Sequence, residues 1–470
     1  MHVAGHSYSL MSSEEVKLIH ESALRILDEV GMEIQNEHLL GDLADFGLKV
    51  DFNTERAYFP TTIVERFLSD AEKYDWASMK PRVGGSAGVY QGRYHDPNSG
   101  KLVPWNEESL SFYFAMTRHL SHVHGAGMLG CQIPVPGSLE PLYERYYCWK
   151  YGAGEGGSIH LDAICPYLLE LYHVAAEHRG VPLGQVFRGT VYLQPPLKLG
   201  RHEAYQVDYF RERGLRVGIG DMYAMGATAP VTFAGAITLN LAEQIALRIL
   251  DWALFGNMSL HLGSAISMLD MRTTIYPYGR PEMAINNLMM AQLARHYGAS
   301  FSGHAGLTDA KLPSVEAGAQ KALTAIPTLL AGGSVGIDAG LLSIDQVFSP
   351  IQMVLDNEFL SALSHFTREF QITEDTIGLE TIIGSGPGGH YLDKQHTVDY
   401  FRNEHWEPNI WSREMLEPWI VDGSHLDVDK AREIVMEVQQ KGVEFAGMAK
   451  TMEKEVLKVI RRAEKELLRV

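Results

Sequence analysis

The sequence predicts an α/β protein: a (β/α)8 TIM barrel with an N-terminal, mainly helical cap and C-terminal helices. From about residue 120, short strand-like runs alternate with helical patterns, which is typical of βα units around a parallel sheet. Eight such runs over about 270 residues match the size of a barrel. Polar or Gly-rich groups follow nearly every run, and no GxGxxG follows the first, so the alternative of a doubly wound open sheet fits less well. The expected strands are Gly125–Gln132, Gly156–Leu161, Phe187–Leu193, Leu215–Gly220, Met258–Ser264, Ser300–His304, Ser334–Asp338 and Thr381–Gly384.

Three regions are expected. Residues 1–115 form a helical cap with a small β insert, residues 116–425 form the barrel, and residues 426–470 form C-terminal helices that pack on it. Ser12 and Glu15 have the spacing of a capping box, which places the start of the first helix. Further helical patterns occur at Glu37–Asp45, Thr61–Asp70, Ala234–Phe255, Pro281–Tyr297, Ser314–Leu330, Pro350–Thr367, Asp427–Gln440 and Met448–Val470.

Composition narrows the classes of partner. The 470 residues include 40 Lys and Arg against 58 Asp and Glu, a formal net charge of −18. Such a surface repels phosphate backbones and anionic lipid, so neither nucleic acid nor membrane is expected as a partner. Three scattered cysteines without a CxxC pair fit a reducing compartment. The N-terminus has no signal-peptide pattern, and we expect a cytoplasmic protein.

Polar residues at the C-terminal ends of the expected strands are the first candidates for a site, because that end of a barrel carries the chemistry. Any one of them alone is as well explained by the need of a buried polar group for a hydrogen-bond partner. Their convergence on one face is what favours function. The candidates are Gln132, His160, Gln194, Asp221, Tyr223, Ser264, His304, Asp338 and, beyond the last strand, His390.

Two loops carry further information. Residues 303–311 read GHAGLTDAK, a strand-to-helix loop of the kind that lines a pocket. Residues 384–390 read GSGPGGH, whose backbone N–H groups suit an anion, although a tight turn between helices is the alternative. The second loop lacks the GK[ST] of a P-loop, so phosphate chemistry is unsupported. We expect no metal bound by this chain, since HExxH and CxxC are absent and the His122–His124 pair is more typical of solvated residues.

Aromatic side chains are the remaining resource for binding. Most aromatics pack in a core, but a few placed over a barrel mouth attract a quaternary ammonium ion by cation–π interaction, each contributing about 0.5–2 kcal/mol. The candidates are Tyr90, Tyr94, Trp105, Tyr223 and Phe348.

Three longer segments resemble the trimethylamine methyltransferase superfamily. They read GATAPVTFAGAITLNLAEQIA (226–246), GGSVGIDAGLLSIDQVFSPIQMVLDNEF (332–359) and GPGGHYLDKQHTVDYFRNEHWEPNIWSRE (386–414), and the N-terminal LMSSEEVKLIHESALRILDEVGMEI is similar as well. The resemblance implies a (β/α)8 barrel that moves a methyl group from a methylated amine to the cobalt of a cognate corrinoid protein. The segment GHAGLTDAK has only standard residues, so the chain resembles the branch without pyrrolysine.

The resemblance to that branch implies a quaternary amine substrate, with glycine betaine favoured, giving dimethylglycine and methyl-Co(III). Proline betaine, carnitine or γ-butyrobetaine are alternative substrates. The corrinoid (cobalamin) is expected on a partner protein, and the family likeness suggests a homo-oligomer. A betaine-binding protein without catalysis stays open as an alternative. A lyase or isomerase needs a Lys or Glu base at a strand end, where only Lys311 comes near.

Residue roles follow from the resemblance together with strand-end placement. We expect the trimethylammonium group to contact Tyr94, Tyr223 and Phe348. The catalytic candidates are His304, His390 and Asp221; the two histidines, with the backbone of Gly388 and Gly389, hold the carboxylate or position the corrinoid. Gln346 belongs to a matched segment and is expected at the substrate, whereas Gln352 and Asp356 are expected to act behind it or in packing.

Overall fold

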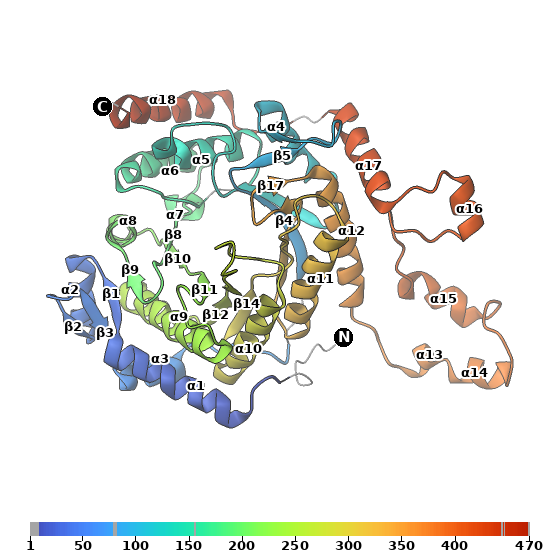
Figure 1. Cartoon of the computed structure of the whole chain (residues 1–470), viewed down its shortest axis with the longest axis horizontal. Coiled ribbons are helices and arrows are strands. Elements are labelled where there is room, and N and C mark those ends of the chain that lie inside the picture. The colour runs from blue at the N-terminus through green and yellow to red at the C-terminus, as the bar shows by residue number, and fades with distance from the viewer. Residues whose placement is uncertain (1–8, 79–81, 155–156, 443–444, 446, 469–470) are drawn as a thin grey trace.

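The computed structural model describes residues 9–78, 82–154, 157–442, 445 and 447–468. About half of the chain is helical, and most strands pair in parallel, so the α/β prediction is confirmed. Figure 1 shows the helices outside the strands, with the blue N-terminal segment and the red C-terminal helix on opposite sides.

The N-terminal region begins as its sequence predicts. At the start of α1 (Ser13–Arg25), the Ser12 side chain accepts a hydrogen bond from the Glu15 backbone N–H, and the Glu15 carboxylate accepts one from the Ser12 backbone N–H, which is the reciprocal capping box. A π-helical turn follows at Ile26–Val30 and ends at Gly31. The helices and strands that complete this region are β1 (Met32–Ile34), α2 (Glu37–Phe46), β2 (Lys49–Asp51), β3 (Arg56–Tyr58) and α3 (Thr61–Asp70).

The parallel strands occur in the predicted order along the chain. Their pairings are β15–β4–β7, β8–β10, β12–β14 and β11–β13, and the described strands form six separate sheets rather than one continuous closed barrel. Their bounds are β4 (Val83–Val89), β7 (Val123–Met128), β8 (Thr190–Tyr192), β10 (Gly218–Gly220), β11 (Tyr223–Met225), β12 (His261–Ser264), β13 (Ile266–Met268), β14 (Ser300–Gly303) and β15 (Val335–Asp338).

Two strand predictions are wrong. Thr381–Gly384 lies within helix α14 (Leu379–Ser385), where β-branched residues favoured a strand reading that the helical surroundings overrule. Gly156–Leu161 contains only an isolated parallel bridge from Ser158 to Thr190, and Gly156 lies outside the described residues. Conversely, β4 pairs in parallel with both β7 and β15, although its sequence was assigned to a peripheral β insert.

Helices connect the parallel strands, and all four long helical patterns predicted between residues 234 and 367 are confirmed. The connecting helices are α4 (Glu107–Met116), α5 (Glu140–Lys150), α6 (Cys165–Arg179), α7 (Leu183–Val186), α8 (Arg201–Arg211), α9 (Phe233–Phe255), α10 (Pro281–Tyr297), α11 (Val315–Leu330) and α12 (Pro350–Phe366). Four short strands complete the body: β5 (Arg93–His95), β6 (Leu102–Pro104), β16 (Leu341–Leu342) and β17 (Val347–Phe348), while β9 (Lys198–Leu199) pairs with β1. Helix α9 is long and apolar enough to cross a membrane, but 72% of its most apolar window is buried inside the protein, as in a core helix.

The C-terminal fifth of the chain leaves the body and returns to it. Helices α13 (Glu374–Ile377), α14, α15 (Gln395–Glu404) and α16 (Leu416–Val421) contain no buried residue, and Figure 1 shows them extending away from the strands. Residues 370–426 are called the arm below. After the arm, α17 (Asp427–Lys441) packs on α12, and α18 (Lys450–Leu467) packs on α5 and α6.

A buried ion pair joins two of the connecting helices. Lys321 on α11 and Asp356 on α12 are 1% and 2% exposed, and their Nζ and Oδ2 atoms are 2.6 Å apart. The same Oδ2 accepts the backbone N–H of Gly340 at 2.8 Å, and Gln352 donates to Oδ1. The pair therefore fixes the turn after β15 relative to both helices.

Replacing Lys321 with Met should lower the free energy of unfolding by about 3–5 kcal/mol, because it leaves the Asp356 carboxylate buried and unpaired. The double variant Lys321→Met/Asp356→Asn should recover more than half of that loss, since Asn still accepts from Gly340 without a charge. Denaturant unfolding followed by circular dichroism measures both. Lys17→Met, which removes the exposed Lys17–Glu21 pair, is the control and should change stability by less than about 1 kcal/mol. A loss in Lys321→Met no larger than in this control would contradict the argument.

Candidate active site

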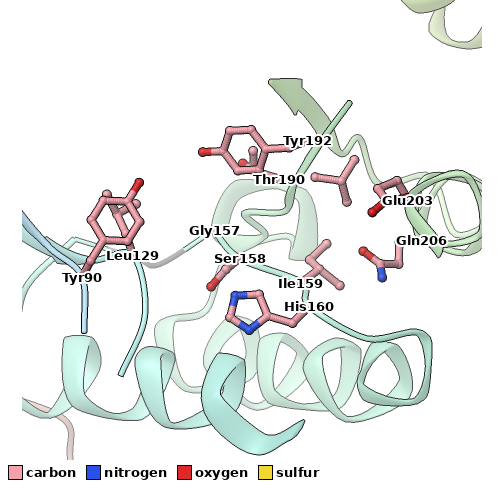
Figure 2. A pocket seen from close by; sticks show the side chains of 11 residues that line it. Tyr90, Leu129, Gly157, Ser158, Ile159, His160, Thr190, Tyr192, Glu203 and Gln206 are labelled. Carbon is pink, nitrogen blue, oxygen red and sulfur yellow. The ribbon is translucent and has the colours of Figure 1, made fainter. Parts of the chain in front are cut away.

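A cavity of about 370 Å³ lies at the C-terminal ends of β4, β7 and β8. Tyr90 directly follows β4, Leu129 follows β7, and Tyr192 ends β8. Figure 2 shows Tyr90 and Leu129 facing Tyr192 across the opening, with Ser158 and His160 between and below them. The cavity is thus built by the strand ends, with tyrosine rings on two of its sides.

Charged groups lie beneath the cavity. Ser158 donates to the buried Glu144 carboxylate, which lies 3.4 Å from the guanidinium of Arg145. Arg145 is fully buried and also donates to Tyr172 and to backbone carbonyls. Burial raises the pKa of Glu144, whereas Arg145 and Ser158 oppose that rise. This network fixes the strand-like segment that carries Ser158 and His160.

A second group of tyrosines and carboxylates lies within electrostatic range of Tyr90, which lines the cavity. The Tyr278 hydroxyl donates to Asp345 Oδ2 at 2.6 Å, and its ring lies 5.7 Å from that of Tyr276 and 5.5 Å from the imidazole of His304. Tyr90 lies within electrostatic range of both Asp345 and Tyr278. We call Tyr90, Tyr192, Tyr276, Tyr278, His304, Asp338 and Asp345 the mouth cluster.

Asp338 ends β15, and its carboxylate accepts no hydrogen bond from the residues that the structure describes. Burial and the neighbouring Asp345 raise the pKa of Asp338 to about 7, against the opposing effect of Lys321. Burial likewise raises the pKa of Asp345 to about 6, which the Tyr278 hydrogen bond opposes. The two carboxylates therefore lie where their charge is poorly compensated.

The loop that carries Asp345 has an uncommon backbone. Ser343, Ile344 and Asp345 have φ values of 55°, 53° and 69°, three consecutive non-glycine residues in the left-handed region. Each such residue costs about 1–2 kcal/mol. Backbone hydrogen bonds to the carbonyls of Ala310 and Thr308, at 2.8 and 3.2 Å, hold the loop in place. The strained backbone thus lies in the part of the loop that directs Asp345 toward Tyr278.

Comparisons with known proteins agree on one family. The family model for trimethylamine methyltransferase (MTTB) matches residues 2–82 and 178–467. The chain belongs to this family. It is 25% identical over 432 residues to the glycine betaine methyltransferase of Desulfitobacterium hafniense (strain Y51), covering 88% of each chain. It is 24% identical to the trimethylamine methyltransferase MttB of Methanosarcina thermophila, covering 92% of this chain and 93% of that one.

Among solved structures, the monomethylamine methyltransferase MtmB of Methanosarcina barkeri is similar with a TM-score of 0.45 and 12% sequence identity, covering 94% of this chain and 90% of MtmB. The resemblance predicted from the sequence motifs is confirmed by the family match, and the chain is a methyltransferase of the MTTB family.

Of the three residues expected to be catalytic, His304 belongs to the mouth cluster and Asp221 lies near it. The His304 Nδ1 has no hydrogen-bond partner among the described residues, and burial lowers the pKa of His304 to about 4, so it is neutral at pH 7. Asp221 accepts hydrogen bonds from Asn240 and Gln244 at 2.8 and 2.6 Å and acts electrostatically on Tyr276. Burial raises the pKa of Asp221.

The expected aromatic contacts are placed elsewhere in this MTTB-family structure. Tyr94 and Phe348 are 5% and 1% exposed, and their rings pack with Trp105 at centroid distances of 5.2 and 5.7 Å. Tyr223 is fully buried beside Asp221 and Glu243, and burial raises the pKa of Glu243 to about 7. These rings do not line the cavity between Tyr90 and Tyr192.

The remaining expected residues are exposed. The Gln346 side chain is exposed, next to Asp345 in the strained loop. Gly388, Gly389 and His390 lie in the arm, where the His390 imidazole is 69% exposed and 3.6 Å from Asp393. The structure therefore does not bring the Gly-rich loop of its own chain to the mouth cluster.

Sequence reasoning missed Tyr192, Tyr276, Tyr278 and Asp345. The signals were the Tyr-x-Tyr pair after β13 and the acidic residue inside LLSIDQVF, both in loops rather than at strand ends. A possible group of metal ligands lies on the surface, where ligand atoms of His38, Asp208 and Glu212 fall within 4.8 Å of one another. Arg211 already donates to Asp208 there, which counts against a metal.

Asp338→Asn should make stability depend less on pH. Because the folded-state pKa of about 7 lies above the unfolded value of about 3.9, the native wild type binds more protons between these values and loses stability as pH rises through them. The variant, which has no charge to bury, should therefore exceed the wild type by about 1–3 kcal/mol at pH 8 and lose that advantage near pH 4.

Urea unfolding at both pH values measures this difference. Asp375→Asn, at an exposed position of the arm, is the control with the same change of charge. A lower stability of Asp338→Asn at pH 8 than at pH 4, relative to wild type, would contradict the assignment.

Proposed function

We propose that the chain transfers a methyl group from a quaternary amine, glycine betaine in the first instance, to the Co(I) of a corrinoid carried by a cognate partner protein. The products are dimethylglycine and methyl-Co(III); proline betaine, carnitine and γ-butyrobetaine are alternative donors. The similarity to a glycine betaine methyltransferase and membership of the MTTB family support this reading. The observation that carries it is the tyrosine-lined cavity beside the uncompensated carboxylates Asp338 and Asp345.

Methyl transfer from a quaternary amine needs little acid–base catalysis from the protein. A quaternary ammonium already has a neutral amine as its leaving group, and reduced cobalt supplies the electron pair for the new bond. The chain must bind the cation, orient one methyl group outward and exclude water. Tyr90 and Tyr192 present ring faces and edges to the cavity for cation–π attraction, and Asp338 and Asp345 add negative potential.

Roles for the residues expected from the sequence follow their placement. We propose that His304 contacts the substrate in the mouth cluster and that Asp221 acts on Tyr276 from behind it. Tyr94, Phe348 and Tyr223 then support the site by packing rather than by direct contact. Gln346 and the Gly388–His390 loop, which are exposed, suit contact with a partner chain.

The strand arrangement supports a single distorted (β/α)8 barrel. An isolated parallel bridge from Ser302 in β14 to Ser334, directly before β15, links two sheets that are otherwise separate, and a second bridge joins Ser158 to Thr190 of β8. The pair β11–β13 continues β10 and β12 along the chain. Exposed apolar residues follow three of these strands and offer a docking rim for the corrinoid protein: Met222, Val231, Met271 and Ile275.

Removing either cavity tyrosine ring should lower methyl transfer. Tyr90→Ala and Tyr192→Ala should each reduce kcat/KM for the quaternary amine about tenfold, the equivalent of one lost cation–π contact of about 1.4 kcal/mol. The assay follows the absorbance change of cob(I)alamin to methylcobalamin. Tyr205→Ala, an exposed tyrosine of α8 that does not line the cavity, is the control. Unchanged kinetics in both cavity variants would contradict the cage, and binding without any transfer would favour a betaine-binding protein.

We also propose a cytoplasmic homo-oligomer, with the arm as its contact surface. The arm is tied to its own body by Arg368–Glu404, by Trp406 Nε1 donating to Ser361, and by Asn409 N donating to Glu358. Before and after these ties it exposes large apolar side chains, including Ile372, Leu392, Val398, Met415, Leu416 and Val421. So many exposed large apolar side chains in one segment are uncommon on monomers and favour an interface between subunits.

Charged substitutions in the arm should therefore dissociate the assembly. Leu392→Asp/Val421→Asp, at positions 87% and 88% exposed, should shift the mass measured by light scattering toward that of one chain, 52.4 kDa. Leu18→Asp, 64% exposed on α1, is the control and should leave the mass unchanged. A wild type that is monomeric at micromolar concentration would overturn this proposal.

A further inference from the structure

The mouth cluster holds more negative than positive charge. Asp345 and Asp356 both act electrostatically on Asp338, and Lys321 is the cation that opposes them. Lys321 is already engaged by Asp356 at 2.6 Å, which leaves Asp338 and Asp345 with no basic partner among the described residues. A cation in the adjoining cavity would meet two carboxylates without a competing protein cation.

Two arginines close to this region are already paired. Arg145, beneath the cavity, is fully buried against Glu144 and accepts no further ligand without breaking that network. Arg280, near Tyr278, bonds Asp309 through Nε at 3.1 Å and lies 3.7 Å from Asp270. The described part of the mouth cluster therefore presents no guanidinium or ammonium group to a substrate carboxylate.

The cluster does offer neutral hydrogen-bonding groups. The Nδ1 of His304 has no hydrogen-bond partner among the described residues, and the ring packs edge-on against Tyr278, which belongs to the same cluster. A half-buried imidazole whose buried Nδ1 has no partner suits a ligand group that completes its hydrogen bonding. A neutral imidazole can donate to or accept from a hydroxyl, whereas it adds no positive charge for a carboxylate.

These observations predict different affinities for two ligands of nearly equal shape. Choline and glycine betaine share a trimethylammonium group, but choline ends in a hydroxyl and glycine betaine in a carboxylate. In glycine betaine that carboxylate accompanies the ammonium into the field of Asp338 and Asp345, so repulsion offsets the attraction. In choline the attraction stands alone, and the hydroxyl suits His304.

We infer that the mouth cluster selects a quaternary ammonium whose fourth substituent is uncharged, of the hydroxyalkyl class that choline represents, over its carboxylate counterpart glycine betaine. The inference rests on the proposed methyl transfer and places a hydroxyalkyl quaternary ammonium ahead of glycine betaine as its donor. In that transfer the C–N bond breaks with its electron pair left on nitrogen, giving neutral dimethylaminoethanol. The methyl group passes to the reduced corrinoid of the partner, which supplies both electrons of the new bond.

Calorimetric titration of the purified chain with choline and with glycine betaine tests the selection without any corrinoid. Choline should bind at least tenfold more tightly at pH 8. Asp338→Asn and Asp345→Asn should each reduce that ratio at least fivefold, while Asp375→Asn on the exposed arm leaves it unchanged. The wild-type ratio decides the question even if a mouth-cluster variant fails to fold, which thermal unfolding reveals.

Equal or tighter binding of glycine betaine, or binding of neither ligand, overturns the inference. Methyl transfer to cob(I)alamin from both donors distinguishes it from the proposed function. Transfer that is faster from glycine betaine, measured as kcat/KM, overturns the selection but leaves the methyltransferase proposal intact. Preferential choline binding with no transfer from any quaternary amine supports the selection and counts against the transfer.

Discussion

The ammonium group of Lys321 holds together the part of the structure on which the site depends. It reaches from α11 to the Asp356 carboxylate on α12, and the same carboxylate receives the backbone N–H of Gly340. Gly340 has a φ of 85°, and a Cβ there would lie 2.5 Å from the Phe348 ring, so the turn needs glycine. One buried pair thus fixes two helices and the turn that follows Asp338. Since a buried charge without its partner is strongly destabilising, the arrangement has little freedom to relax.

That rigidity is what allows the site to keep unfavourable features. Asp338 is half-buried, and its carboxylate accepts no hydrogen bond from the described residues, while Ser343–Asp345 hold left-handed backbone geometry. Both raise the free energy of the folded state, and both occur at the end of β15 or in the loop that follows it. Features of this kind persist when the surroundings over-determine them, and they cluster where a ligand is bound. The buried Lys321–Asp356 pair holds these surroundings in place through its hydrogen bond to Gly340.

The sequence predicted correctly those features whose pattern lies in neighbouring residues. Helices such as Pro281–Tyr297 and strands such as Ser300–Gly303 have periodicity and boundaries written in adjacent residues, so they were predictable. Strand β4, VGGSAGV, lacks β-branched residues in its interior and is a strand because β7 and β15 lie on either side. His304 and Asp338 were found because each closes or follows a strand, whereas Asp345 reaches Tyr278 through a tertiary contact that no local pattern encodes.

The aromatic residues also show where prediction from sequence fails. Tyr94 and Phe348 have the chemistry of a cation cage, yet they pack against Trp105 and Tyr113 in the core. Tyr90 and Tyr192 have the same chemistry and line a cavity. Residue type cannot separate the two cases, because ring burial against protein and ring exposure to a ligand both favour aromatic side chains.

The charge of the mouth cluster depends on the protonation of its carboxylates. His304 is neutral above about pH 4. Burial raises the phenol pKa values of Tyr90 and Tyr278 above their ordinary value, so both phenols stay protonated at physiological pH. Near neutral pH the groups of the cluster that change charge are therefore the two carboxylates, with pKa values of about 7 and 6. A bound cation favours their ionised forms, so cation binding and proton release are linked, and affinity for a cation rises with pH through this range. The same burial that makes these carboxylates costly in the empty protein makes them responsive to the charge of what enters the cavity.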